Sequence, residues 1–153
     1  MSSPLRIALI GAGIMGQQHY QHLKTLTAAT LCAVADPGPQ APSLAKEWGV
    51  GFFADHRQML DQAKPEAVII ANPNALHVST ALDCLAAGVP VLLEKPVGVH
   101  LDEARELVAA SKSSGVAVLV GHHRRHNPLI ARAHELVHSG ALGRLSTVTA
   151  LWQ

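Results

Sequence analysis

The sequence has little charge of either sign and no long apolar run. Charged residues make up 15% of its 153 residues, and the formal net charge is +1. Such a balance gives no electrostatic reason to expect nucleic acid or an anionic membrane surface as a partner. No apolar run approaches the length of about 20 residues that a transmembrane helix needs. From the composition we therefore expect neither nucleic acid nor a membrane as a partner.

Cysteine is also scarce. The two cysteines, Cys32 and Cys84, lack metal-ligand spacing, and we predict that both are buried as small apolar side chains. The start of the chain does not resemble a secretory signal, because the apolar run at residues 5–10 is short and leads into a glycine turn. We therefore expect a protein of the reducing cytoplasm.

Apolar residues are plentiful, at 48% of the chain, which is enough for a folded core. Short apolar runs alternate with helical patterns, as in a doubly wound α/β fold whose parallel sheet is covered on both faces. The predicted strands are residues 6–11, 30–35, 51–53, 67–71, 91–94 and 116–120. The predicted helices are residues 14–25, 41–48, 57–62, 75–87, 101–114 and 128–139.

A glycine motif follows the first predicted strand. Gly11, Gly13 and Gly16 have the spacing of a dinucleotide-binding turn, in which they permit a tight turn, close approach of a pyrophosphate and helix–strand packing respectively. The helix would start near Ile14 and Met15, and its backbone N–H groups and positive dipole end would meet the pyrophosphate. The alternative is a glycine turn in an unrelated α/β domain.

An acidic residue stands at the distance this motif requires. Asp36 lies twenty positions after Gly16, at the end of the second predicted strand, where a carboxylate can accept the two ribose hydroxyls of an adenosine. It would repel a 2′-phosphate, and Pro37 and Gly38 supply no cation to offset that repulsion. The sequence therefore predicts NAD in preference to NADP. The alternative role for Asp36 is that of a turn or helix cap.

Further polar residues follow two later strands, at the sheet edge where ligands of open α/β folds bind. Asn72 and Asn74 could cap the next helix or offer amides to a ligand, and His77 is more easily interpreted as a packing histidine than as a chemical group. Glu94, Lys95 and Pro96 stand at the carboxyl end of the fifth predicted strand. Lys95 could bind a ribose or substrate hydroxyl or relay a proton, although such a lysine is often only a solvated side chain.

The segment from Gly121 to Pro128 contains three histidines and two arginines. His122 and His126 are four residues apart, which would suit a metal on a helix, but Pro128 follows closely and no cysteine or paired acid accompanies them. We interpret the segment as a polar loop lining a cleft and expect no metal site.

Together these motifs resemble the oxidoreductases typified by glucose–fructose oxidoreductase, inositol dehydrogenase and the rhizopine-catabolism protein MocA. The Glu94-Lys95-Pro96 triplet is the most specific mark, and Asn72 is a small departure, since the family often has Thr or Ser there. The resemblance implies a Rossmann domain, hydride transfer with a sugar, cyclitol or similar polyol, a cis bond between Lys95 and Pro96, and a homo-oligomer at full length. It assigns Lys95 as the catalytic residue. The cofactor-binding residues would be Gly11, Gly13, Ile14, Met15, Gly16, Asp36, Asn72, Asn74, His77, Glu94, Lys95 and Pro96.

The end of the chain has a different pattern. Alternating and β-branched residues at positions 144–152 predict a strand, which would be the first element of a second α/β domain that is otherwise missing. We therefore expect a cofactor domain at residues 1–125, a connecting helix and strand at residues 126–153, and no turnover by this chain alone. A non-catalytic NAD-binding sensor or regulatory module remains the alternative function.

Overall fold

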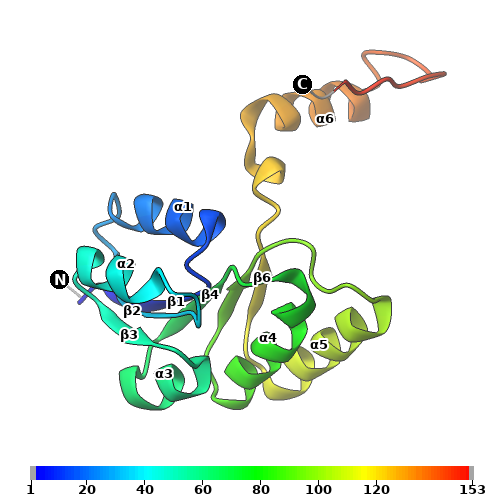
Figure 1. Cartoon of the computed structure of the whole chain (residues 1–153). Helices are drawn as coiled ribbons and strands as arrows, with labels where there is room; N and C mark the ends of the chain where they lie inside the picture. The colour runs from blue at the N-terminus through cyan, green and yellow to red at the C-terminus, as the bar shows by residue number, and fades with distance from the viewer. Residues whose placement is uncertain (1–2, 152–153) are drawn as a thin grey trace. The chain divides into compact units, whose positions relative to one another are not determined.

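The structure, a computed structural model, describes residues 3–151. The chain divides into two units, Met1–Gly121 and His122–Gln153. The first unit contains a six-stranded parallel sheet in the order β3-β2-β1-β4-β5-β6 (Figure 1). Its strands are β1 (Leu5–Ile10), β2 (Ala29–Ala35), β3 (Gly51–Phe53), β4 (Ala67–Ile70), β5 (Val91–Leu93) and β6 (Val118–Val120).

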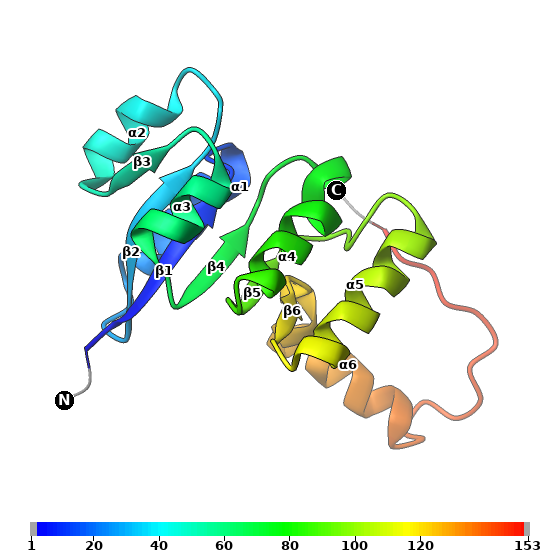
Figure 2. The same ribbon diagram turned by 90° about the horizontal axis from the view of Figure 1, so that it is seen from below.

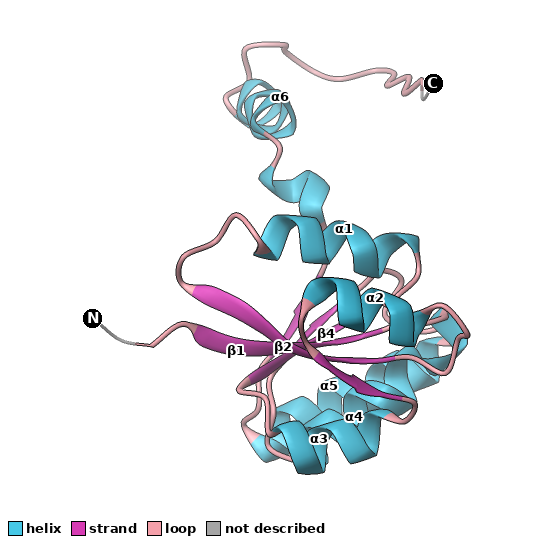
Figure 3. Ribbon diagram, turned by 60° about the vertical axis from the view of Figure 1, so that its left-hand side comes forward, coloured by secondary structure: helices cyan, strands magenta, loops and turns pink. Residues whose placement is uncertain are grey.

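Helices cover both faces of this sheet. The helices of the unit are α1 (Ile14–Leu23), α2 (Ala41–Trp48), α3 (His56–Ala63), α4 (His77–Ala86) and α5 (Leu101–Ser114), with a 3₁₀ turn η1 (Asn74–Leu76) before α4. Figure 3 shows α1 and α2 on one face and α3, α4 and α5 on the other, and Figure 2 shows α4 and α5 side by side. The doubly wound fold predicted from the sequence is confirmed.

The sheet separates two apolar cores. Under α3, α4 and α5, buried side chains such as Met59, Leu85 and Leu107 pack on the sheet. Under α1 and α2, the buried residues include Leu23 and Ala45. Because both faces are buried, the strands carry nearly continuous apolar residues rather than an alternating pattern.

The predicted elements match the observed ones with small shifts. Residues 41–48, 51–53 and 101–114 have the predicted bounds. The predicted helix at residues 75–87 instead divides into η1 and α4, because Leu76 at φ −102° and ψ −5° interrupts the regular helix. The strand predicted at residues 116–120 begins two residues later than expected, because its pairing with β5 begins at Val118, opposite Val91.

The second unit contains the 3₁₀ turn η2 (His123–His126) and helix α6 (Pro128–His138). The Asn127 side chain caps α6 by accepting from the Leu129 N–H at 2.8 Å. The strand predicted at positions 144–152 is wrong for residues 144–151, which form neither helix nor strand, and Trp152 lies outside the described residues. A strand needs a partner backbone, and the described residues of this unit provide none.

Within the described part of the chain, none of the helices is both long and apolar enough to cross a membrane.

Candidate cofactor site

The candidate site lies at the carboxyl ends of the strands. The sheet order reverses between β1 and β4, and such a switch point opens a crevice in which ligands of α/β folds bind. A cavity of about 650 Å³ lies there. Its lining includes Gly11 after β1, Asp36 and Gly38 after β2, the segment from Ala54 to Arg57 after β3, and Asn72 and Asp83 from β4 onward.

Two of the motif glycines are required by the fold. Gly11 has φ +97°, and a Cβ there would lie 2.5 Å from the Ala71 carbonyl oxygen. Gly16 lies in α1, where a Cβ would collide with the Gly11 carbonyl. The turn and the close helix–strand contact predicted for these two positions are therefore present.

Gly13 differs from the other two. A Cβ at this position would meet nothing within 4 Å, so the protein itself does not need glycine here. Gly13 is the N-cap of α1 and makes no side-chain cap, which leaves the first-turn N–H groups of the helix without intrahelical acceptors. The side chains of Ile14 and Met15 are exposed. An open space in front of uncapped N–H groups fits a pyrophosphate.

Asp36 is held by backbone N–H groups on both of its oxygens. Oδ2 accepts from the Ala12 N–H at 2.7 Å, and Oδ1 accepts from the Gly38 N–H at 2.6 Å. Each carboxylate oxygen can accept more than one hydrogen bond, so acceptor capacity for two ribose hydroxyls remains. The contacts fix the half-buried carboxylate beside the glycine turn, where a dinucleotide would need it.

The residues after β4 make contacts within the protein. The Asn72 amide donates to Thr80 Oγ1 at 2.9 Å, and its buried Oδ1 finds no partner among residues 3–151. Neither Asn72 nor Asn74 caps a helix, because Pro73 and Leu76 occupy the cap positions of η1 and α4 without side-chain bonds. The capping alternative is therefore wrong, and Asn74 is exposed.

His77 connects two loops of the site. It is 1% exposed, its Nδ1 lies 2.6 Å from the Pro96 carbonyl oxygen, and its Nε2 lies 3.0 Å from that of Asn72. The imidazole thus links the loop after β4 to the loop after β5. This geometry supports the packing interpretation and gives His77 a positioning role.

The loop after β5 presents Lys95. Glu94 is 7% exposed, its Oε1 lies 2.9 Å from His19 Nε2, and its Oε2 accepts from the Lys95 N–H at 3.2 Å. The Lys95 side chain is exposed and has no hydrogen bond or ion pair with any described residue. The Lys95–Pro96 bond is cis, as predicted. His19 of α1 thus connects the glycine-motif helix to the lysine loop.

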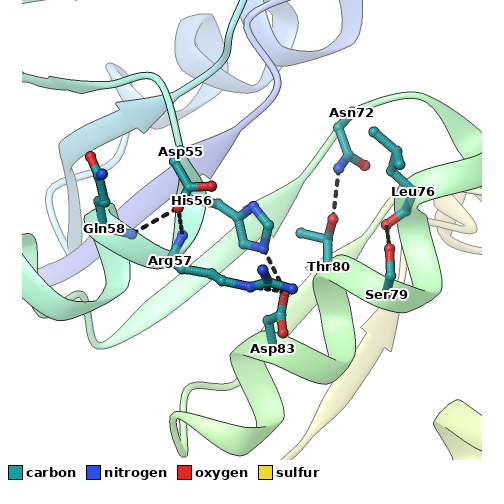
Figure 4. Close-up of polar contacts among 9 residues, drawn as sticks. All are labelled: Asp55, His56, Arg57, Gln58, Asn72, Leu76, Ser79, Thr80 and Asp83. Atoms are coloured by element: carbon teal, nitrogen blue, oxygen red, sulfur yellow. Dashed lines mark hydrogen bonds and ion pairs between the residues drawn. The ribbon is translucent and has the colours of Figure 1, made fainter.

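A further polar cluster lines the cavity and was not predicted. His56 Nε2 and Arg57 Nε both contact Asp83 Oδ2, at 2.8 and 2.9 Å (Figure 4). Burial raises the pKa of Asp83, but the hydrogen bonds from His56 and Arg57 outweigh it and lower the pKa below its ordinary value. The cluster joins α3 to α4. No sequence signal pairs residues this far apart.

The segment from His122 to His126 belongs to the second unit. In the part of the chain that the structure describes, no group of three or more histidine, cysteine or acidic side chains is placed to hold a metal ion.

Comparison with known proteins agrees with this geometry. Residues 5–122 match the GFO/IDH/MocA family model, described as an oxidoreductase family with an NAD-binding Rossmann fold. The chain is 32% identical over 144 residues to the rhizopine catabolism protein MocA of Rhizobium meliloti, covering 94% of this chain and 45% of that protein. It is 36% identical over 145 residues to an inositol 2-dehydrogenase of Rubrobacter xylanophilus, covering 93% and 42%.

A solved structure is similar over the same span. The scyllo-inositol dehydrogenase of Lactobacillus casei, crystallised with NAD(H) and scyllo-inositol, aligns with a TM-score of 0.85 and 27% identity, covering 92% of this chain and 42% of that one. The chain thus spans less than half the length of the relatives it matches.

Proposed function

Because the chain belongs to the GFO/IDH/MocA oxidoreductase family, with its NAD-binding Rossmann fold, we propose that the whole protein is an NAD-dependent dehydrogenase. Its reaction moves a hydride between the nicotinamide and a carbinol or carbonyl of a sugar, cyclitol or similar polyol. The names of the relatives, inositol 2-dehydrogenase among them, support this substrate class. The observation that carries the proposal is the open space at Gly13 beside the anchored Asp36 carboxylate. The sensor alternative is not favoured, since the named relatives include several dehydrogenases.

The glycine turn and Asp36 hold the two ends of the adenosine diphosphate part of the cofactor. The N–H groups of Gly13, Ile14 and Met15 bind the pyrophosphate, while Gly11 and Gly16 shape the turn. Asp36 accepts the adenosine ribose hydroxyls. Glu94, Pro96, Asn72, Asn74 and His77 form the loops that flank the site, and the contacts of His77 support a positioning role for it.

Lys95 is the proposed catalytic residue. It stands after β5 on the loop that His19 and His77 hold from two sides, and its ammonium has no partner among residues 3–151. An amine so placed can donate a hydrogen bond to a ribose or substrate hydroxyl and take part in moving the hydroxyl proton. The bound cofactor supplies the hydride acceptor.

The cofactor is proposed to be NAD rather than NADP. The Asp36 carboxylate already accepts two backbone N–H groups, so it cannot move away from a 2′-phosphate without leaving those donors unpaired. The family resemblance further supports a homo-oligomer. The free cysteines, one buried and one half-buried, support a cytoplasmic location.

Calorimetric titration of the chain with NAD⁺ and NADP⁺ tests the cofactor assignment. Charge-assisted hydrogen bonds at the ribose contribute about 1.5–3 kcal/mol, so NAD⁺ should bind roughly 10–100-fold more tightly. Asp36→Ala should narrow that difference, while Asp102→Ala, which changes the net charge equally at an exposed position of α5, should preserve it. Equal or tighter binding of NADP⁺ by the wild-type chain would contradict the assignment.

Turnover by the whole protein tests the reaction. NADH formation should be seen with members of a panel of inositols and aldoses. Lys95→Ala should lower kcat much more than it weakens NAD⁺ binding. Lys95→Arg keeps the positive charge but has no readily titrated amine, so it separates the role of the charge from that of proton transfer. A Lys95→Ala enzyme with unchanged kcat would refute the role of Lys95.

A further inference from the structure

A cationic side chain, Arg57, lines the same cavity as Asp36, although the residues next to Asp36 in sequence provide none. Strands β2 and β3 pair in parallel up to Ala35 and Phe53, and the Asp36 N–H continues the ladder by donating to the Phe53 carbonyl at 3.1 Å. The residues that follow β3 therefore emerge beside Asp36. Both His56 and Arg57 of this segment line the same cavity as Asp36.

Arg57 is held across the cavity wall by α4. Its Nε donates to Asp83 Oδ2 at 2.9 Å, and His56 Nε2 lies 2.8 Å from the same oxygen (Figure 4). The Arg57 side chain is 71% exposed and that of Asp83 is 28% exposed, so the carboxylate is the more buried partner of the pair. Only Asp83 fixes the direction of this long and otherwise solvated side chain among the described residues.

The remaining charged side chain of the cavity wall, Asp55, does not offer a cation to a phosphate either. Asp55 also lines the cavity, and its Oδ1 accepts from the N–H groups of Arg57 and Gln58 as the cap of α3. It caps the helix and does not pair with the Arg57 side chain in any described contact. The described residues that line the cavity thus include three carboxylates, at positions 36, 55 and 83, and an Arg57 guanidinium that is paired with Asp83 through Nε.

We propose that Asp83 is a specificity-determining residue for the cofactor, which keeps the Arg57 guanidinium from the 2′-phosphate of NADP. The inference rests on the proposed binding of NAD at this site. Asp36 rejects the phosphate directly by its charge, and Asp83 rejects it indirectly by restraining Arg57, the one arginine among the described residues that line the cavity. Arginine is the side chain best suited to phosphate, since its planar fork donates two parallel hydrogen bonds.

The test compares the ratio of the Kd for NADP⁺ to the Kd for NAD⁺ in four proteins: wild type, Asp83→Ala, Arg57→Ala and the double variant. Binding is measured by calorimetry. Where binding is weak, it is measured by the displacement of bound NADH, followed by NADH fluorescence. Asp83→Ala should lower the ratio about two- to fivefold, the range for a new but exposed contact to phosphate. Arg57→Ala alone should leave the ratio nearly unchanged, because Asp83 restrains Arg57 in the wild type.

The double variant separates release of Arg57 from mere loss of a carboxylate. If Arg57 binds the phosphate, the gain of Asp83→Ala disappears in the double variant; if the gain persists there, or never occurs, the inference is wrong. Asp102→Ala controls for the change in net charge. Asp83→Asn, which keeps the shape of the side chain, should give a smaller gain and serves if the alanine variant does not fold. Failure of the wild type to bind NAD⁺ would instead contradict the proposed function.

Discussion

Replacing Gly13 by valine is expected to abolish NAD binding while leaving the fold intact. Gly13 has φ −68° and ψ −167°, an extended conformation open to any residue. A Cβ there meets nothing within 4 Å. The added side chain would instead occupy the space before the first turn of α1, where the pyrophosphate should bind.

The two expected effects differ greatly in size. Valine is a poorer N-cap than glycine, but it also reduces the entropy of the unfolded chain, so the free energy of unfolding should change by less than about 1 kcal/mol. Each lost hydrogen bond to a charged phosphate costs about 1.5–3 kcal/mol. Loss of two such contacts would raise the Kd for NAD⁺ at least about a hundredfold.

Gly11 provides the matched contrast. At φ +97° an alanine would be strained, and its Cβ would lie 2.5 Å from the Ala71 carbonyl oxygen. Gly11→Ala should therefore destabilise the fold by more than about 1 kcal/mol, whereas Gly13→Val should not. Urea unfolding followed by circular dichroism measures stability, and calorimetry measures binding. A Gly13→Val chain that binds NAD⁺ like the wild type, or one that unfolds as readily as Gly11→Ala, would refute the assignment of this space to the pyrophosphate.

Two further predictions follow from the titrating groups. Burial raises the pKa of Cys84 to about 12 and also raises that of half-buried Cys32, so iodoacetamide at neutral pH should label Cys84 only after unfolding, as peptide mass spectrometry would show; rapid labelling of the native chain would contradict its burial. The pKa of Asp83 is lower in the folded chain than its ordinary value of 3.8, so its stabilising contribution is present above that pH and is lost as the pH falls through the folded pKa. Asp83→Ala should then lower the urea midpoint near neutral pH but not in strong acid, and an equal difference at both pH values would count against the ion pair.

The fold was predictable because its signals are local. Short apolar runs bounded by turn residues gave strands such as Gly51–Phe53 their observed bounds, and the glycine motif lies within six consecutive residues. The role of Asp36 could also be predicted, because a single βαβ unit fixes its distance from the glycine turn. Each of these features depends on residues close together in the chain or on a fixed spacing.

The polar contacts of the site were not predictable in the same way. His19 and Glu94 are separated by 75 residues, and Arg57 and Asp83 by 26. These pairs form only because the strand order brings β5 beside β4 and because α3 and α4 cover the same face of the sheet. A sequence pattern identifies each residue as polar but does not identify its partner. The lack of a cationic side chain directly after Asp36 in the sequence therefore did not imply that the cavity lacks one.

The failure at residues 144–151 has a related cause. Alternating and β-branched residues favour an extended strand, but its N–H and C=O groups must pair with another backbone. Helix α6, in the same unit, needs no such partner, because its hydrogen bonds close within the segment and Asn127 caps its start. The described residues of this unit form one helix and one 3₁₀ turn and offer no strand edge. The pattern at residues 144–151 therefore indicates only that the segment favours an extended conformation. The segment forms a strand only where a second backbone lies beside it and pairs with it.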